Sequence, residues 1–254
     1  MTNAPYDATF FKGQRDASMV AAKQVLPLAF SVIPCMSLLD VGCGVGPWVA
    51  AAQELGVPEA VGVDGSYVDR QLLLISEQHF VSSDLTKPLE LHRKFDLVIS
   101  MEVAEHIDPS AAGLFIDNLV RHSDAVLFSA AIPGQGGTFH VNEQWPEYWR
   151  AKFAAREYQQ FDVIRNSIWE NREVPCCYRQ NTYLYVNSRS LGRFPALLQA
   201  DLKNSRPVAC IHPEVFAEAL GRPLALRRIF HELPAALRRT LEIRGRKLLK
   251  GFVK

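Results

Sequence analysis

The stretch from Leu38 to Trp48 constrains the fold of this chain more than any other feature. It reads Leu-Leu-Asp-Val-Gly-Cys-Gly-Val-Gly-Pro-Trp, a short apolar run followed by three alternate glycines and a helix-compatible run. Glycines in such a turn let the backbone approach a ligand closely, and the free N–H groups at a helix start favour an acceptor-rich or anionic group. Pro47 suits the first helical turn, where its missing N–H costs nothing. The stretch therefore predicts a strand, a ligand-binding turn and a helix.

Two later apolar runs end in carboxylates. The first ends in Asp64, 18 residues beyond Gly46, close to the offset of about 20 residues at which an acidic residue meets a ribose diol in dinucleotide folds. An unpaired carboxylate at the end of a buried strand would be costly, and a ribose diol offers it two donors. The second run ends in Ser83 and Asp84, where the alternative is a turn aspartate before Thr86. Together these tips predict a nucleoside-containing ligand at the carboxyl edge of a sheet.

Apolar runs alternate with helix-compatible segments through the middle of the chain. We expect strands at 37–41, 60–64, 79–82, 95–100 and 125–131, and helices at 16–30, 47–56, 66–76 and 111–121. Strands that alternate with helices at this pace imply a parallel sheet covered on both faces. A ligand then belongs at the carboxyl ends of the strands.

Taken in order, four segments resemble the motifs of class I S-adenosylmethionine-dependent methyltransferases. They are Asp40-Val-Gly-Cys-Gly-Val-Gly, Asp64, Ser83-Asp84-Leu85 and Phe95-Asp-Leu-Val-Ile-Ser, and the resemblance covers about residues 37 to 186. The competing NAD interpretation expects Gly-x-Gly-x-x-Gly and a second mononucleotide-binding half, neither of which this chain has.

The resemblance implies an α/β fold: a Rossmann-like, doubly wound, seven-stranded sheet, mostly parallel with one antiparallel strand. Segments 161–165 and 181–187 fit its distal antiparallel pair. We therefore expect an N-terminal helical cap at 1–36, a methyltransferase domain at 37–187 and a helical, basic C-terminal extension at 188–254.

The resemblance also assigns cofactor contacts. Asp40 stands where the family's acidic residue orients the amino-acid end of S-adenosylmethionine, although it could instead cap the glycine turn. By the same resemblance Asp84 accepts from the adenine amino group and Leu85 packs on the ring. The residues expected to bind the cofactor are Asp40, Gly42, Gly44, Gly46, Asp64, Gly65, Ser83, Asp84, Leu85, Met101 and Glu102.

A cluster of titratable residues follows the fourth expected strand. If a helical turn begins near residue 102, Glu102, Glu105 and His106 share one face at i, i+3 and i+4. Such a face is either a metal site or an acid/base cluster. The pattern Glu-x-x-Glu-His resembles ubiquinone-biosynthesis O-methyltransferases and enzymes that methylate the terminal 2′-hydroxyl of small RNAs, which implies Mg²⁺ or another divalent ion held by Glu102, Glu105, His106 and His140. In other members of the family the same letters border the cofactor without a metal.

The loop after the fifth expected strand places polar groups among aromatic ones. Gly134, Gly136 and Gly137 precede His140-Val-Asn-Glu-Gln-Trp-Pro, and Tyr148 and Trp149 follow. A polar set in an aromatic frame suits a hydroxylated ligand such as a sugar. His140 is the first candidate general base, with His106 second and Glu143 beside it; alternatively His140 and Glu143 merely pin the loop and cap the next helix. The segment resembles a bacterial subgroup of these methyltransferases, from which Cys176-Cys177 departs.

Composition bounds the cellular setting. An apolar content of 48% and a charged content of 22% describe an ordinary globular protein, and neither a signal peptide nor a membrane span is evident. Five cysteines without a Cys-x-x-Cys pair suggest reduced thiols and a cytoplasmic location. Residues 222–254 carry ten Lys and Arg against two Glu, which predicts attachment to an anionic inner membrane face, nucleic-acid affinity or a solvated tail.

The sequence thus predicts a cytoplasmic S-adenosylmethionine-dependent methyltransferase that acts on a sugar hydroxyl of a glycan or glycosylated metabolite. Two alternatives stand beside it. A metal-dependent RNA 2′-O-methyltransferase would explain Glu102, Glu105, His106 and the basic tail, although that tail adjoins no aromatic stacking motif. A scaffold that binds the cofactor without catalysis would leave the biological role unchanged by alanine at Asp64 or His140.

Overall fold

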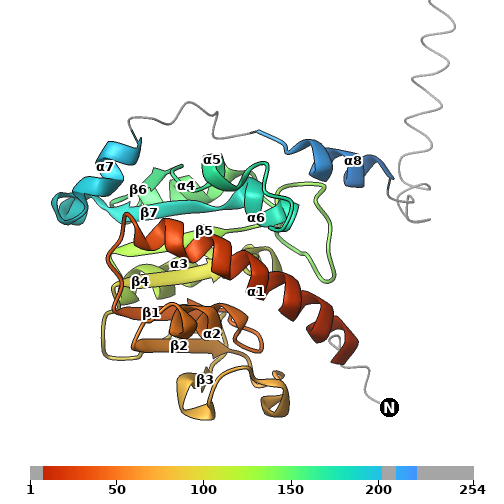
Figure 1. Ribbon diagram of the computed structural model, residues 1–254, viewed down its shortest axis with the longest axis horizontal. Coiled ribbons are helices and arrows are strands. Elements are labelled where there is room, and N and C mark those ends of the chain that lie inside the picture. Colours follow the sequence, from red (N-terminus) through yellow and green to blue (C-terminus); the bar gives the residue numbers. More distant parts are fainter. Residues whose placement is uncertain (1–7, 202–209, 222–254) are drawn as a thin grey trace, which may run out of the picture. The chain divides into compact units, whose positions relative to one another are not determined.

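A single mixed sheet forms the centre of the protein. The computed structural model describes residues 8–201 and 210–221, so the basic segment 222–254 lies outside the described residues. The strand order is β3-β2-β1-β4-β5-β7-β6, which can be followed from the bottom of Figure 1 upward. The strands are β1 Ser37–Val41, β2 Glu59–Asp64, β3 Phe80–Ser82, β4 Leu97–Met101, β5 Ala125–Ser129, β6 Tyr158–Phe161 and β7 Tyr183–Asn187.

Strand direction confirms the predicted fold class. β1 pairs in parallel with β2 on one side and β4 on the other, with Leu39 opposite Val61 and Val98. The pairs β2–β3 and β4–β5 are also parallel. β7 runs antiparallel to both β5 and β6, so among the described strands only β7 is reversed. The carboxyl ends of β1, β2 and β4 therefore meet at one edge, as a ligand site there requires.

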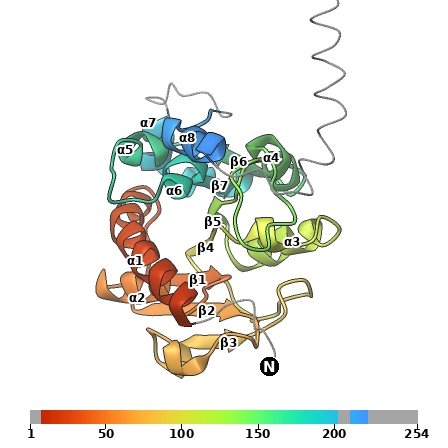
Figure 2. The same ribbon diagram turned by 90° about the vertical axis from the view of Figure 1, so that its right-hand side faces the viewer.

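Helices cover both faces of the sheet. Figure 2 shows α1 and α2 on one face and α3 and α4 on the other. The α-helices are α1 Ala8–Phe30, α2 Pro47–Glu54, α3 Ala112–His122, α4 Pro146–Ala154, α5 Arg165–Ile168, α6 Cys176–Asn181, α7 Pro195–Asp201 and α8 Pro213–Gly221. The 3₁₀-helices are the single turns η1 Arg70–Leu72, η2 Glu77–His79 and η3 Ala104–His106, and the longer η4 Ser188–Arg193. None of the helices in the described ranges is long and apolar enough to cross a membrane.

Alternation along the central strands builds two separate core layers. On β1, Leu38 packs in the layer under α1 and α2, whereas Leu39 packs in the layer under α3 and α4. On β4, Ile99 and Val98 divide in the same way. Side chains two apart on a strand share a face, so strands that are apolar at every position can serve both layers. This is why the central strands read as continuous apolar runs.

The structure corrects three of the predicted elements. The segment 66–76 is not a helix: η1 is a single turn capped by Asp69, whose side chain accepts the Gln71 N–H. The predicted strand at 161–165 lies earlier, as β6, because a short helix begins at Arg165. The predicted strand at 181–187 begins at Tyr183, since α6 continues to Asn181.

The described residues up to Phe216 belong to one compact unit, and Ala217–Gly221 belong to a second. Within the first unit, α1 contributes Ala22, Val25 and Leu26 to the same core layer as α2. α1 begins at Ala8, earlier than the predicted helix start at 16, and it continues through Pro27. The proposed domain boundaries at 36/37 and 187/188 stay predictions.

Candidate functional site

The glycine turn follows β1 as predicted and leads directly into α2. Gly42 has φ of +90°, and a Cβ there would lie 2.5 Å from the Val103 side chain. Gly46 caps α2 with φ of +85° and is followed by Pro47 at the first helical position. Both positions require glycine because L side chains rarely adopt this conformation. The predicted strand, turn and helix are therefore present, and close approach of a ligand to the turn stays a prediction.

Asp64 lies at the end of β2 and is tied to the glycine turn. Its Oδ2 accepts the Gly44 N–H at 2.6 Å, and its Oδ1 accepts the Gly65 N–H at 2.6 Å. The Tyr67 hydroxyl donates to the same Oδ1 at 2.5 Å. Burial raises the pKa of Asp64, and these three bonds oppose the rise. The carboxylate is thus satisfied inside the protein, contrary to the expectation of an unpaired group.

Asp40 lies one strand away and is buried, with 1% of its surface exposed. Its Oδ2 has no hydrogen-bond partner among the described residues. Burial, and then the neighbouring charge of Asp64, raise the pKa of Asp40 well above its ordinary value. Burial and the like charge of Asp64 thus favour the neutral form of the Asp40 carboxyl over the charged form.

Asp84 forms a local turn. Its Oδ1 accepts the Thr86 hydroxyl at 2.6 Å and the Thr86 N–H at 3.0 Å, and its Oδ2 lies 3.1 Å from the Lys87 ammonium. The bonds from Thr86, more than the pair with Lys87, lower the pKa of Asp84 to about 2. The Ser83 N–H donates to the Asp64 carbonyl at 2.8 Å, and Leu85 is buried. The turn interpretation therefore has direct support, and the adenine contact stays a prediction.

Glu102 follows Met101 at the end of β4 in a left-handed conformation, with φ of +56°. Its N–H donates to the Ser129 hydroxyl at 2.9 Å. Its carboxylate accepts Gln135 Nε2 at 2.7 Å on one oxygen and Asn181 Nδ2 at 3.1 Å on the other. Burial raises the pKa of Glu102, and the two amides oppose the rise. Because η3 begins only at Ala104, Glu102 does not share a helical face with Glu105 and His106 as predicted.

Gln135 and Asn181 are site residues that the sequence did not single out. Both amides are buried, and Asn181 Nδ2 also donates to Gln135 Oε1 at 2.8 Å. Together they hold Glu102 between the glycine loop after β5 and the end of α6. A pairing across 46 residues leaves no periodic signal. The only hint in the sequence was the polar character of the two segments.

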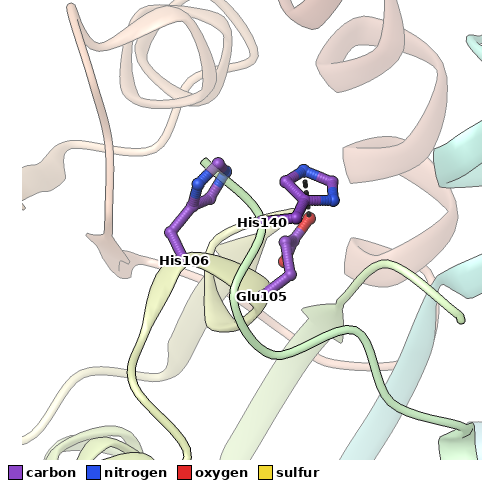
Figure 3. A group of neighbouring side chains, drawn as sticks. All are labelled: Glu105, His106 and His140. Atoms are coloured by element: carbon purple, nitrogen blue, oxygen red, sulfur yellow. Dashed lines mark ion pairs between the residues drawn. The ribbon is translucent and has the colours of Figure 1, made fainter. Parts of the chain in front are cut away.

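Glu105, His106 and His140 form a compact cluster at the same edge of the sheet (Figure 3). One ligand atom from each lies within 4.8 Å of the others. Glu105 is 1% exposed, and neither of its oxygens, nor His106 Nδ1, has a hydrogen-bond partner in the described part of the chain. Three of the four predicted metal ligands are therefore brought together, whereas Glu102 pairs with the amides instead.

The electrostatics of this cluster favour neutral groups. Burial, followed by the charge of Glu102, raises the pKa of Glu105 well above its ordinary value. Burial and the nearby His140 lower the pKa of His106 to about 4. The two imidazole rings meet edge to face with their centroids 4.9 Å apart. A carboxyl and two imidazoles this close together are a donor set suited to a divalent ion with mixed N and O ligands, which would favour the ionised form of Glu105.

Glu143 organises the loop that carries His140. Its Oε1 accepts the Gly136 N–H at 2.6 Å and His140 Nδ1 at 2.9 Å, and its Oε2 accepts the Gly134 N–H at 2.8 Å. A proton on Nδ1 leaves the lone pair on Nε2, which lies 4.0 Å from Glu105 Oε1. Glu143 therefore both pins the loop, as the plainer alternative held, and orients His140 as a general base requires.

The predicted aromatic frame is only partly present. Trp149 is 2% exposed and packs on Phe128 in the core, so it is a core residue. Trp145 and Phe139 are 42% and 56% exposed. Of the predicted frame, Trp145 thus remains at the surface and Tyr148 is half-buried against Trp149, because the helix that begins at Pro146 turns Trp149 inward.

Comparison with known proteins agrees with this geometry. The sequence matches the family described as "Methyltransferase domain" over residues 13–164. Two curated relatives, ribosomal protein L11 methyltransferases from Thermotoga petrophila and Thermotoga maritima, are each 33% identical over 105 residues, which is 38% of this chain. The chain spans only 37% of the length of these relatives.

Solved structures show the same fold. A sugar N-methyltransferase from Streptoalloteichus sp superposes with a TM-score of 0.56 and 18% identity, over 74% of this chain and 97% of that one. The plantazolicin methyltransferase BpumL, solved in complex with SAH, gives a TM-score of 0.51 and 11% identity, over 71% and 88%. The family match covers more than half of the chain, and the sheet order, the glycine turn and these neighbours agree with it. The chain therefore belongs to the methyltransferase domain family and has the fold of the class I S-adenosylmethionine-dependent methyltransferases.

Proposed function

We propose that the protein transfers a methyl group from S-adenosylmethionine to a hydroxyl of a sugar, in a glycan or a glycosylated metabolite. The observation that carries the proposal is the orientation of His140. Glu143 fixes the protonated Nδ1 at 2.9 Å, and Nε2 is left as an acceptor at the carboxyl edge of the sheet. A hydroxyl needs a base when it is methylated, and a positioned imidazole supplies one.

The cofactor side of the proposal rests on the turn after β1 and on the tip of β2. The glycine turn would admit close approach by the amino-acid end of S-adenosylmethionine, and Asp40 Oδ2, which has no hydrogen-bond partner among the described residues, would meet it there. Asp64 offers its remaining acceptor capacity to the ribose diol. By the family resemblance, the buried Leu85 would pack on the adenine ring. When bound, S-adenosylmethionine supplies an electrophilic methyl group, and the chain's own residues must position the acceptor.

Proton removal is the chemical step that the chain performs itself. The acceptor oxygen forms a bond to the methyl carbon as the carbon–sulfur bond breaks, and His140 Nε2 takes the hydroxyl proton. The resulting imidazolium is stabilised by the Glu143 carboxylate, which already accepts from Nδ1. His106 is less suited to this role, because burial and the nearby His140 lower its pKa to about 4, which makes it a weak base near neutral pH.

A divalent ion such as Mg²⁺ fits the same edge. Glu105, His106 and His140 would hold it, since the two Glu105 oxygens and His106 Nδ1 are without partners in the described structure. The ion would act as a Lewis acid that lowers the pKa of the acceptor hydroxyl. In that case His140 would be a ligand, and the two proposals make opposite predictions for chelation.

The acceptor class rests on the exposed aromatic pair. Phe139 adjoins His140 in the chain, Trp145 follows five residues later, and both side chains are exposed. The flat face of an aromatic ring suits the C–H face of a sugar. The structural neighbour from Streptoalloteichus is described as a sugar N-methyltransferase, which supports a sugar but not the choice of oxygen. Attachment to a membrane through residues 222–254 stays a prediction.

The test is methyl transfer from radiolabelled S-adenosylmethionine to a panel of nucleotide sugars and glycosides, with and without EDTA. We expect incorporation that is lost in His140→Ala and retained in His79→Ala, a matched change outside the site. Activity that survives EDTA supports His140 as the base, and activity that EDTA abolishes and Mg²⁺ restores supports the metal.

Transfer to short RNA in place of sugars would favour the RNA alternative, for which the Glu105, His106 and His140 cluster is the supporting observation. Binding of S-adenosylmethionine without transfer to any class would favour the non-catalytic scaffold. Failure to bind it would overturn the proposed function.

A further inference from the structure

The segment after β2, residues 65–75, lies across the glycine turn and is anchored to it at both ends. At one end the Tyr67 hydroxyl donates to Asp64 Oδ1. At the other end the Leu74 N–H donates to the Val45 carbonyl at 2.9 Å. A Cβ on Gly46 would lie 3.0 Å from the Ile75 side chain, which is 7% exposed. We call residues 65–75 the strap.

The two anchors of the strap differ in how easily they can be released. The Leu74–Ile75 anchor combines a backbone hydrogen bond with a buried apolar side chain that belongs to the core. Tyr67 is 61% exposed, and its hydroxyl donates to the Asp64 carboxylate. Its ring lies against Gly65, where a Cβ would be 2.2 Å away. The Tyr67 end is therefore the one that a ligand can open.

Counting acceptor sites on Asp64 shows why it must open. Each carboxylate oxygen offers two lone pairs. Oδ1 already accepts from the Gly65 N–H and from Tyr67, whereas Oδ2 accepts only from the Gly44 N–H. One ribose hydroxyl can be accepted by Oδ2 without any change. A second one needs the lone pair on Oδ1 that Tyr67 occupies.

We propose that the Tyr67 hydroxyl stands in for one hydroxyl of the cofactor ribose, and that the cofactor binds Asp64 fully only by displacing it. The inference rests on the proposed function, since it takes Asp64 as the ribose acceptor. Tyr67 thereby sets the affinity for the nucleoside: it keeps the buried carboxylate satisfied while the site is empty and competes with the ligand for it. Both glycine N–H donors belong to the backbone and remain in place.

Binding of S-adenosylhomocysteine, measured by calorimetry, tests the displacement. Tyr67→Phe keeps the ring and removes only the competing donor, so the Kd should fall about tenfold, the equivalent of about 1.4 kcal/mol for one charge-assisted bond. Tyr185→Phe, which removes a hydroxyl bonded to Gln160 in the core, should leave the Kd unchanged. The 2′-deoxy and 3′-deoxy analogues sharpen the result, because for one of them Tyr67→Phe should give no gain.

A ligand-free measurement separates this inference from the proposed function. The Tyr67 bond holds the pKa of Asp64 down against burial, so carbon NMR should show a higher Asp64 pKa in Tyr67→Phe than in the wild type. If the pKa rises and the Kd is unchanged or weaker, displacement is wrong while the proposed function stands. If neither protein binds S-adenosylhomocysteine, the proposed function is wrong and the inference falls with it. If the pKa of Asp64 is the same in Tyr67→Phe and in the wild type, the hydrogen bond on which the inference rests is absent, and the inference is wrong.

Discussion

The two glycine-rich loops at the carboxyl edge are organised in the same way around one carboxylate each. Asp64 accepts two backbone N–H groups and the Tyr67 hydroxyl, with two donors on one oxygen and one on the other. Glu143 accepts two backbone N–H groups and His140 Nδ1 in the same distribution. The shared pattern teaches that a carboxylate can fix a glycine loop while keeping a single side-chain partner in a defined place.

The difference lies in that side-chain partner. Tyr67 is 61% exposed, whereas the His140 side chain is 12% exposed and faces Glu105. The donor on Asp64 can leave and be replaced by a ligand hydroxyl. His140, the side-chain donor on Glu143, is held through Nδ1 so that its Nε2 can accept a proton. We therefore assign the first loop to cofactor binding and the second to proton removal, and the following substitutions test that division.

The largest expected effect comes from Glu143→Gln. The glutamine amide places an N–H donor against at least one of the three donors that Glu143 now accepts from. The variant should therefore lose both the fixed conformation of the loop and the fixed tautomer of His140. We expect kcat for methyl transfer to fall by about 10²- to 10⁴-fold, the usual worth of a positioned base, with the Kd for S-adenosylmethionine unchanged. Glu147→Gln is the matched control on the neighbouring helix. Equal losses of kcat in the two variants would contradict an orienting role for Glu143.

Asp64→Asn should act on binding instead. The NH₂ group of the asparagine would face either the Gly44 N–H or the two donors on Oδ1, so donor would meet donor. The substitution also removes the charge that a ribose diol would meet. We expect the Kd for S-adenosylmethionine to rise about 100-fold, or about 2.7 kcal/mol. Calorimetry measures it, with Asp69→Asn, a cap of a surface turn, as the control. A normal Kd in Asp64→Asn would move the cofactor away from β2.

Alanine substitution of one glycine in each loop should lower the stability of the folded protein by different amounts. Gly42 and Gly134 have nearly the same φ, +90° and +88°, but only Gly42 has a neighbour within 4 Å of a Cβ, the Val103 side chain at 2.5 Å. Gly134→Ala pays backbone strain alone, about 1–2 kcal/mol. Gly42→Ala adds overpacking of about 1–3 kcal/mol. Denaturant unfolding should therefore show the larger loss of stability in Gly42→Ala, and equal losses would mean that Val103 moves aside at little cost.

The first loop could be predicted from the sequence and the second only in part. Strand, glycine turn and helix are adjacent in the chain, so local rules place Gly42 to Pro47 and the next strand tip at Asp64. The strap was wrongly predicted as a helix because its apolar residues pack as an irregular segment, with Ile75 over Gly46 and Val68 in the core, instead of on a helix face. The conformation of the second loop depends on contacts between residues far apart in the chain, such as Gln135 with Asn181.

The partners of Glu102 show the limit of periodicity. A helical turn from residue 102 would have joined it to Glu105 and His106, but the left-handed backbone at Glu102 turns its carboxylate toward Gln135 and Asn181. No spacing in the chain announces such a contact. The cluster of Glu105, His106 and His140 was predicted, because two of its members are adjacent and the third is in the next loop at the same sheet edge.

The smallest expected effect concerns acid stability. The pKa of His106 is about 4 in the folded protein and about 6.5 in an unfolded chain, so the unfolded state binds its proton first. Its stabilising contribution is complete above about pH 6.5 and is lost progressively as the pH falls to about 4. His106→Asn removes this contribution. Stability curves of the two proteins should therefore run parallel above pH 6.5 and converge below it, which urea titrations at pH 7.5, 6, 5 and 4.5 can measure. If the difference between the curves is independent of pH, then the pKa of His106 is not lowered in the folded protein. The imidazole would in that case be more exposed to solvent than its burial beside His140 indicates.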